Sequence, residues 1–193
     1  SDPSGLFNPD MQERPEGGIL RLGSPGEYTY RVRTELASKT VNFVSWYDAL
    51  RFCNWLHNGR PNGRQGAATT ESGAYAFSGK ESVGERGGKA RFALSSENEW
   101  YKAAYFAPRR GYSLMNILGQ AVERPKNSKS HYGAEEIADK FWEWNESVVS
   151  KLGRGLRSGG WFQGNNRQAA GRFFSNQEME LANIGFRVVK LTE

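Results

Sequence analysis

Apolar side chains recur at helical spacing in the stretch VNFVSWYDALRFCNWLHNG, where the apolar positions are Trp46, Ala49, Leu50, Cys53 and Leu56. Ser45 is a good N-cap, and Asp48 three residues later places a carboxylate near the positive end of the helix dipole. Asn58 and Gly59 supply a stop signal. The pattern predicts an amphipathic helix, and it places Cys53 on the buried face as an inert thiol.

A second helix is predicted in RFALSSENEWYKAAYF, after a short strand at its start. Ser96 and Glu99 have the spacing of a capping box, in which each side chain bonds to the other residue's backbone N–H. Trp100, Ala103 and Ala104 then follow on one face. This helix is therefore expected to begin at the capping box and to bury that face.

Strand patterns occur at the start and near the end of the chain. YTYRVRT, residues 28–34, alternates like a half-buried strand, and KFWEWNE, GLRSGGWF and NIGFRVVKL are also typical of strands. Between them lie two irregular stretches, residues 58–90 and 107–138, in which only GAYAF suggests a short strand. This order predicts an α+β fold, with two helices against small antiparallel sheets and long irregular loops.

We expect one domain over residues 1–193, with the two irregular stretches as loop insertions. Its core is predicted from the apolar faces of the elements, at Trp46, Leu50, Trp100, Ala104, Trp144 and Phe186.

Composition narrows the class of protein. The 193 residues are 37% hydrophobic, enough for a real core, and the net charge of +5 comes without a dense Lys/Arg stripe, which favours a solvated surface over nucleic-acid binding. No apolar run is long enough to span a membrane, so no span is expected. The single cysteine excludes an internal disulfide and fits a reducing compartment, so a cytoplasmic location is favoured, with export left open.

The residues offer little for catalysis. His57 and His131 are the only histidines, and neither has the neighbouring Cys, His or carboxylate spacing of a metal site. GERGGK lacks the spacing of a phosphate-binding loop. Glu143 and Glu146 could form a carboxylate pair, but their place in a strand favours a structural hydrogen-bonding role for Glu143. No enzyme, metal or cofactor is predicted.

Five ordered motifs carry a family resemblance: VNFVSWYDALRFCNWL, FALSSENEWYKAAYF, WEWNE, RGLRSGGW and NIGFRVV. Together they resemble the formylglycine-generating, sulfatase-modifying superfamily, from about Val41 to Val189. The resemblance implies a C-type-lectin-like fold. Two motifs depart from the usual pattern, LSSE at the second helix and ADKFWEW at the following strand. The latter segment can help hold calcium in the family, so a structural calcium ion stays an open alternative to no cofactor.

The residues that perform the family's chemistry are missing. Formylglycine-generating enzymes carry paired cysteines shortly after the Arg-Gly-Gly motif, where they bind copper, but SGGWFQGNNRQAAGRFF has no cysteine. Copper(I) prefers soft thiolate ligands. The relatives that make ergothioneine intermediates use several histidines, and two cannot match them. A divergent oxidoreductase with a relocated site is the alternative function.

A second branch of the superfamily is more similar, the variable proteins of diversity-generating retroelements. In them the segment before a terminal Gly-Phe-Arg is rewritten by adenine-directed mutagenesis and binds ligands. The corresponding segment here is residues 161–183, with Arg172 as a fixed position. The resemblance implies these ligand-contacting residues: Phe162, Gln163, Gly164, Gly171, Phe173, Phe174, Ser175, Asn176, Met179, Leu181 and Asn183.

The predicted function is therefore a non-catalytic display protein whose unknown ligand is expected to be a protein. Exported bacterial proteins that share SENEWYKAAYF and WEWNE are the alternative relatives, and they are not known to be diversified. Trp161 is expected to belong to the scaffold, because a Trp beside glycines usually packs. Phe162, Phe173 and Phe174 either fill the core beneath the loops or stand exposed as anchors.

Overall fold

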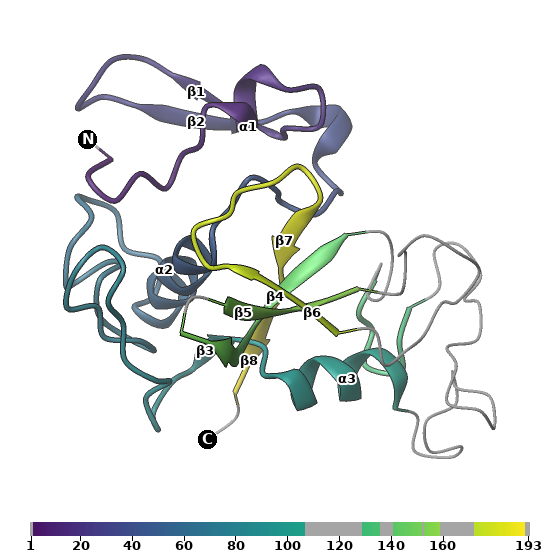
Figure 1. The fold of residues 1–193 in the computed structure, drawn as a ribbon. Coiled ribbons are helices and arrows are strands. Elements are labelled where there is room, and N and C mark those ends of the chain that lie inside the picture. Colours follow the sequence, from purple (N-terminus) through teal and green to yellow (C-terminus); the bar gives the residue numbers. More distant parts are fainter. Residues whose placement is uncertain (1, 107–128, 136–140, 152, 159–171, 192–193) are drawn as a thin grey trace. The chain divides into compact units, whose positions relative to one another are not determined.

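A computed structural model gives the fold, and it describes residues 2–106, 129–135, 141–151, 153–158 and 172–191 (Figure 1). The chain forms two compact units, Ser1–Leu94 with Gln177–Glu193, and Ser95–Asn176. A single domain over residues 1–193 stays a prediction.

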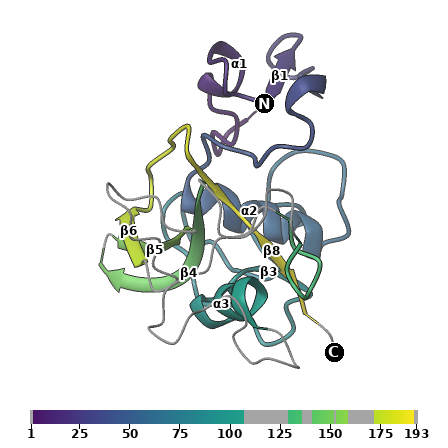
Figure 2. The ribbon, with the colours of Figure 1, turned by 90° about the vertical axis from the view of Figure 1, so that its right-hand side faces the viewer.

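The first unit contains most of the secondary structure, in the order α1 (Asp10–Glu13), β1 (Ile19–Leu22), β2 (Thr29–Val32), the 3-10 helix η1 (Thr34–Leu36), α2 (Trp46–His57), β3 (Phe92–Leu94), β7 (Ile184–Phe186) and β8 (Val188–Lys190). β3 and β8 pair antiparallel, from Phe92 opposite Lys190 to Leu94 opposite Val188. Figure 2 shows this pair close to α2. The predicted strand NIGFRVVKL thus forms two strands, which meet at Arg187.

The predicted first helix is confirmed as α2. The Ser45 hydroxyl accepts a hydrogen bond from the Asp48 backbone N–H at 3.1 Å, and the Asp48 carboxylate accepts one from the Ser45 N–H at 3.0 Å. The helix ends at His57 with Asn58 as its C-cap, and Gly59 follows with a φ of 85°, a left-handed conformation that glycine adopts without strain. The Cys53 thiol is fully buried, as predicted.

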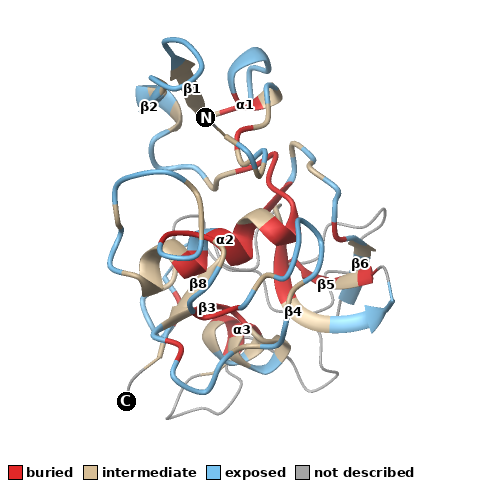
Figure 3. Cartoon of the chain, turned by 90° about the vertical axis from the view of Figure 1, so that its left-hand side faces the viewer, coloured by how far each residue is buried: buried red, intermediate tan, exposed pale blue. Residues whose placement is uncertain are grey.

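The N-terminal strand forms, but its predicted half-burial is wrong. β2 pairs antiparallel with β1, and all four β2 residues are exposed, Tyr30 by 51% and Val32 by 60% (Figure 3). The Phe7 ring lies 5.8 Å from that of Tyr30, and this contact leaves most of β2 exposed. Residue alternation predicts a strand, and it does not show how much of the strand is covered.

The loop at residues 58–90 has no helix or strand, as predicted, and GAYAF contributes only an isolated bridge from Phe77 to Val83. Buried polar side chains of α2 hold this loop. The Asn54 amide donates to the carbonyl oxygens of Thr70 and Tyr75 at 2.7 and 2.9 Å. The Arg51 guanidinium contacts the Glu71 carboxylate at 2.9 Å.

The contact with Arg51 helps to lower the pKa of Glu71. Partial burial acts to raise the pKa of Glu71, but hydrogen bonds from Arg51 and Thr70 outweigh it and hold the pKa below its ordinary value. The carboxylate therefore stays ionised beside Arg51, whose side chain is almost fully buried.

The second unit contains α3 (Glu97–Tyr105), β4 (Trp142–Ser150), β5 (Gly153–Arg157) and β6 (Arg172–Asn176). The predicted capping box at the start of α3 is confirmed: the Ser96 hydroxyl and the Glu99 carboxylate each accept from the other's backbone N–H. The three strands are antiparallel neighbours in the order β6-β5-β4. β4 is buried near its start and exposed at its end, as Figure 3 shows.

The predicted core is largely confirmed. Five of its six residues are buried, namely Trp46, Leu50, Trp100, Ala104 and Trp144. Phe186 is partly buried, packed against a cluster that contains Phe7, Met11 and Phe43. These apolar faces are therefore placed inside the two units as the sequence indicated.

Candidate ligand-binding surface

The candidate surface begins at β6, which the pattern of apolar residues did not predict. β6 pairs with β5 without a register shift, from Arg172 opposite Arg157 to Asn176 opposite Gly153. Phe173 lies opposite Leu156, which is buried, yet Phe173 is 44% exposed and Phe174 is 53% exposed. The backbone of β6 is therefore paired along its whole length while its two aromatic side chains are exposed.

The exposed rings form an aromatic group. The Phe173 and Phe174 ring centroids lie 5.9 Å apart in a stacked arrangement, and the Trp142 ring of β4 lies 5.5 Å from Phe173. Val148 and Val149, at the end of β4, are 70% and 52% exposed. Sequence reasoning missed the half-buried Trp142 beside these rings and the exposure of the two valines, because the strand pattern alone does not show which end of β4 is covered.

Two glycines of β5 leave room for neighbouring side chains. A Cβ atom at Gly153 would lie 3.1 Å from the Phe174 ring and 2.7 Å from the Ser150 hydroxyl. At Gly155 a Cβ atom would collide with the Asn145 amide. Glycine at both positions thus lets the Phe174 ring and the Asn145 side chain lie close against β5.

A polar network lies beside these strands and ends on Glu97, the first residue of α3. The Glu97 carboxylate accepts hydrogen bonds from Arg157 Nε at 2.9 Å and Asn145 Nδ2 at 3.1 Å, and Arg172 Nε lies 2.6 Å from its other oxygen. Arg157 is 1% exposed. The family resemblance singled out Arg172 as a fixed position, but nothing in the sequence pointed to Glu97, whose partners are distant along the chain.

Glu143 has a structural role, as the sequence predicted. It is buried, and its carboxylate accepts a hydrogen bond from the Trp100 indole N–H at 2.6 Å. Trp100 also receives the Arg157 guanidinium over its ring, 5.6 Å from the centroid. The carboxylate is therefore engaged in the interior of the second unit and does not face solvent.

Three further predicted residues, Met179, Leu181 and Asn183, are exposed in the first unit. Their backbone is held in place. The Phe43 N–H donates to the Leu181 carbonyl at 3.1 Å, and the Asn42 amide donates to the Ala182 carbonyl at 3.0 Å. This segment therefore presents side chains to solvent from a fixed main chain.

Glu180 lies between two of these exposed residues and is itself half-buried. Its carboxylate accepts a hydrogen bond from the Asn8 amide. Burial raises the pKa of Glu180 above its ordinary value, because desolvation disfavours the charged form more than the Asn8 hydrogen bond favours it. Glu180 thus differs from its exposed neighbours and belongs to the support of this segment.

The remaining predicted residues fall into two groups. Ser175 is half-buried and Asn176 is exposed, both on β6. Trp161 and four predicted contact residues lie outside the described part of the chain, namely Phe162, Gln163, Gly164 and Gly171.

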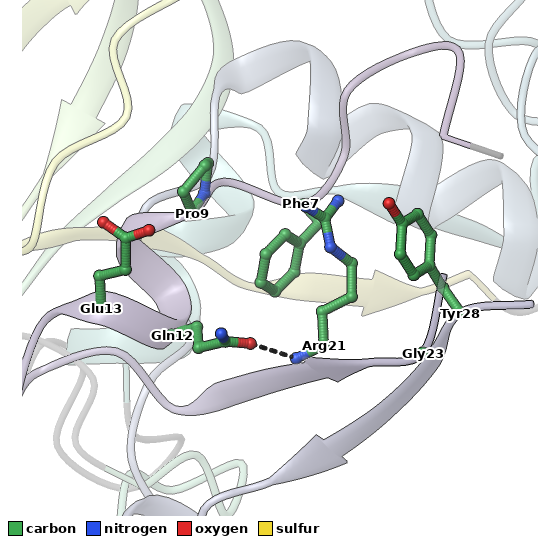
Figure 4. Close-up of a pocket in the computed structure, with 7 residues that line it drawn as sticks. All are labelled: Phe7, Pro9, Gln12, Glu13, Arg21, Gly23 and Tyr28. Carbon is green, nitrogen blue, oxygen red and sulfur yellow. Dashed lines mark hydrogen bonds between the residues drawn. The ribbon is translucent and has the colours of Figure 1, made fainter. Parts of the chain in front are cut away.

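A small pocket in the first unit was not predicted (Figure 4). Its volume is about 240 Å³, and it is lined by Phe7, Pro9, Gln12, Glu13, Arg21, Gly23 and Tyr28. The Arg21 guanidinium lies between two rings, 4.2 Å from the Phe7 centroid and 4.5 Å from the Tyr28 centroid. Cation–π contacts on both sides hold Arg21 in this hollow.

The described residues contain no group of three His, Cys, Asp or Glu side chains that could hold a metal ion. His57 is half-buried and its Nδ1 accepts the Arg91 N–H at 3.0 Å, while His131 is exposed. Within the ranges that the structure covers, none of the helices has the length and apolar character needed to cross a bilayer.

Comparison with known proteins gives a family match over most of the chain. Residues 24–192 match the profile of the sulfatase-modifying factor enzyme 1-like domain. No curated protein matches the chain. The structure is similar to that of CarF, with a TM-score of 0.59 and 15% identity, over 84% of this chain and 72% of CarF.

It is also similar to Treponema denticola variable protein 1, with a TM-score of 0.48 and 21% identity, over 77% of this chain and 69% of that protein. With the family match, the likeness to CarF shows the C-type-lectin-like α+β fold that the motifs implied.

Proposed function

The chain belongs to the family of sulfatase-modifying factor enzyme 1-like domains, and within that family we propose that it is a non-catalytic protein that binds a ligand through residues 161–183. The observation that carries this proposal is the exposure of the stacked Phe173 and Phe174 rings on a strand whose pairing partner is buried. Fold alone does not assign function, so the proposal depends on this surface.

A protein is the partner that this surface fits best. Rigid aromatic side chains supply large contact areas at low entropy cost, and they are enriched among residues that dominate binding energy. Phe173 and Phe174 would be the anchors, and Ser175 and Asn176 would add adaptable hydrogen bonds. Met179, Leu181 and Asn183 form the other exposed part of the predicted segment.

We further propose that this segment is diversified, as in the variable proteins of diversity-generating retroelements. The test is the nucleotide sequence around the coding region. A near-repeat of the last coding segment, differing at adenines and lying beside a reverse transcriptase gene, is the expected finding. A locus with neither would remove diversification from the proposal and would favour a fixed ligand.

The alternative function is an oxidoreductase of the family's copper-dependent type with a relocated site. One thiol is present in the chain, Cys53, and it is fully buried. Copper(I) sites in proteins need accessible soft ligands, and a single buried thiol does not supply a pair.

We expect no formylglycine when the protein is incubated with copper(I) and a cysteine-containing sulfatase peptide. Mass spectrometry of the peptide measures the outcome, and a formylglycine-generating enzyme serves as the positive control. An oxidised peptide cysteine that persists in a Cys53→Ala variant would reveal a relocated site and overturn the binding proposal.

A further inference from the structure

One carboxylate in the second unit contacts each of the three strands described there. Glu97, at the start of α3, accepts from Asn145 of β4 and from Arg157 of β5, and it pairs with Arg172 of β6. The distances are 3.1, 2.9 and 2.6 Å. Each strand therefore has one side chain that contacts the first residue of α3.

Two arginines lie beside this carboxylate, and their positive charges repel each other. Arg157 and Arg172 lie directly opposite each other in the β5–β6 register, so two positive charges stand on neighbouring strands. Like charges in such a cross-strand pair are destabilising. Glu97 lies against both guanidinium groups and offsets their repulsion.

The Arg172 side chain is 70% exposed, which by itself would suggest a ligand-contacting residue. Its Nε is nevertheless engaged with Glu97, whose side chain is only 19% exposed. Phe173 follows immediately, and its ring contacts that of Trp142. The ion pair of Arg172 thus connects the start of β6 to α3, directly before the exposed rings.

We infer that Glu97 is a positioning residue that fixes β6 through Arg172, and that Arg172 belongs to the frame of the surface and not to its ligand-contacting residues. The inference rests on the proposed function insofar as β6 carries the binding surface. The surface would then contain two kinds of residue, those that contact the ligand and those that hold the strand. Phe173 and Phe174 can change with the ligand, whereas Glu97 and Arg172 must stay together for the strand to be presented in one position.

The test uses Arg172→Met, which removes the connection to β6 and leaves Arg157 and Asn145 on Glu97. The protein is labelled with 5-fluorotryptophan, and the Trp142 signal among the six tryptophans is assigned from a Trp142→Phe variant. We expect the Trp142 fluorine signal to shift or broaden while that of Trp144 stays in place. Amide exchange of residues 172–176 should quicken about two- to fivefold, the change that loss of an exposed ion pair produces.

Two control variants separate the effect of losing a positive charge from the effect of losing the contact at position 172. Lys151→Met removes an exposed positive charge from the turn between β4 and β5 and should leave both readouts unchanged. Arg172→Lys keeps the charge and should restore most of the wild-type exchange.

An Arg172→Met protein with wild-type exchange in β6 and an unchanged Trp142 signal would overturn the inference, because backbone pairing alone would then fix the strand. Equal changes at Trp142 and Trp144 would overturn it too, since Arg172 would then support the whole unit. Neither readout uses a ligand. A protein that binds no ligand could therefore still show the expected changes in Arg172→Met, and a protein that binds a ligand could still fail this test.

Discussion

Truncation of Trp144 to alanine is expected to lower the free energy of unfolding by about 3–5 kcal/mol, the usual cost of removing a buried aromatic side chain. Trp144 is fully buried in β4, opposite the buried Leu156 of β5. Its removal would leave a large cavity that the neighbouring strand can fill only in part. Urea unfolding followed by circular dichroism measures the change.

The matched control lies on the same strand. Val148 is 70% exposed, so Val148→Ala should change stability by no more than about 0.5 kcal/mol. If both variants lost similar stability, the burial gradient along β4 would be wrong. A Trp144→Ala protein as stable as the wild type would contradict the placement of the core.

The second large effect is expected at Glu97. Glu97→Gln keeps the shape of the side chain but removes the negative charge beside Arg157, which is 1% exposed. Removing one partner of a buried ion pair typically costs about 3–5 kcal/mol, because the remaining charge stays desolvated without full compensation. The same urea unfolding experiment measures the loss.

Glu135→Gln is the control for this change. Glu135 and Lys129 form an ion pair of 2.6 Å in which both side chains are more than half exposed. Solvent screens such a pair, so the same carboxylate-to-amide change should leave stability essentially unaltered. Equal stability of the Glu97→Gln and Glu135→Gln proteins would mean that the Glu97 network contributes little.

Elements with a local signal were predictable from the sequence. Both capping boxes, at Ser45 with Asp48 and at Ser96 with Glu99, bring together residues three positions apart. Such spacing fixes geometry without knowledge of the rest of the fold. Spacing also identified the apolar stripe of α2, and with it the buried Cys53.

Features that depend on distant partners were not predictable in this way. β6 has the sequence RFFSN, without alternation, and it is a strand because it pairs with β5. Glu97 meets Asn145 and Arg157, which lie 48 and 60 residues later in the chain. Only the assembled unit places these groups together.

Burial is the third feature that sequence could not settle. The alternation of residues 28–34 correctly indicated a strand, yet Tyr30 and Val32 are 51% and 60% exposed, because alternation does not show how much of a strand is covered. For Phe173 and Phe174 both burial and exposure were open, and the structure places both rings at the surface. Family resemblance predicted a ligand-binding segment, and the structure shows that these two of its side chains are exposed.

The most direct test of the central claim, that the fold does not depend on the predicted ligand-contacting side chains of the C-terminal segment, is thermal unfolding of a combined variant. It exchanges these residues together for Asn or Ser: Phe162, Gln163, Phe173, Phe174, Ser175 and Met179. Surface substitutions change stability by about 0.5 kcal/mol or less each, so we predict one cooperative transition near the wild-type melting temperature, far above that of Trp144→Ala. Loss of cooperative unfolding in the combined variant would contradict the account, because these side chains would then be part of the core.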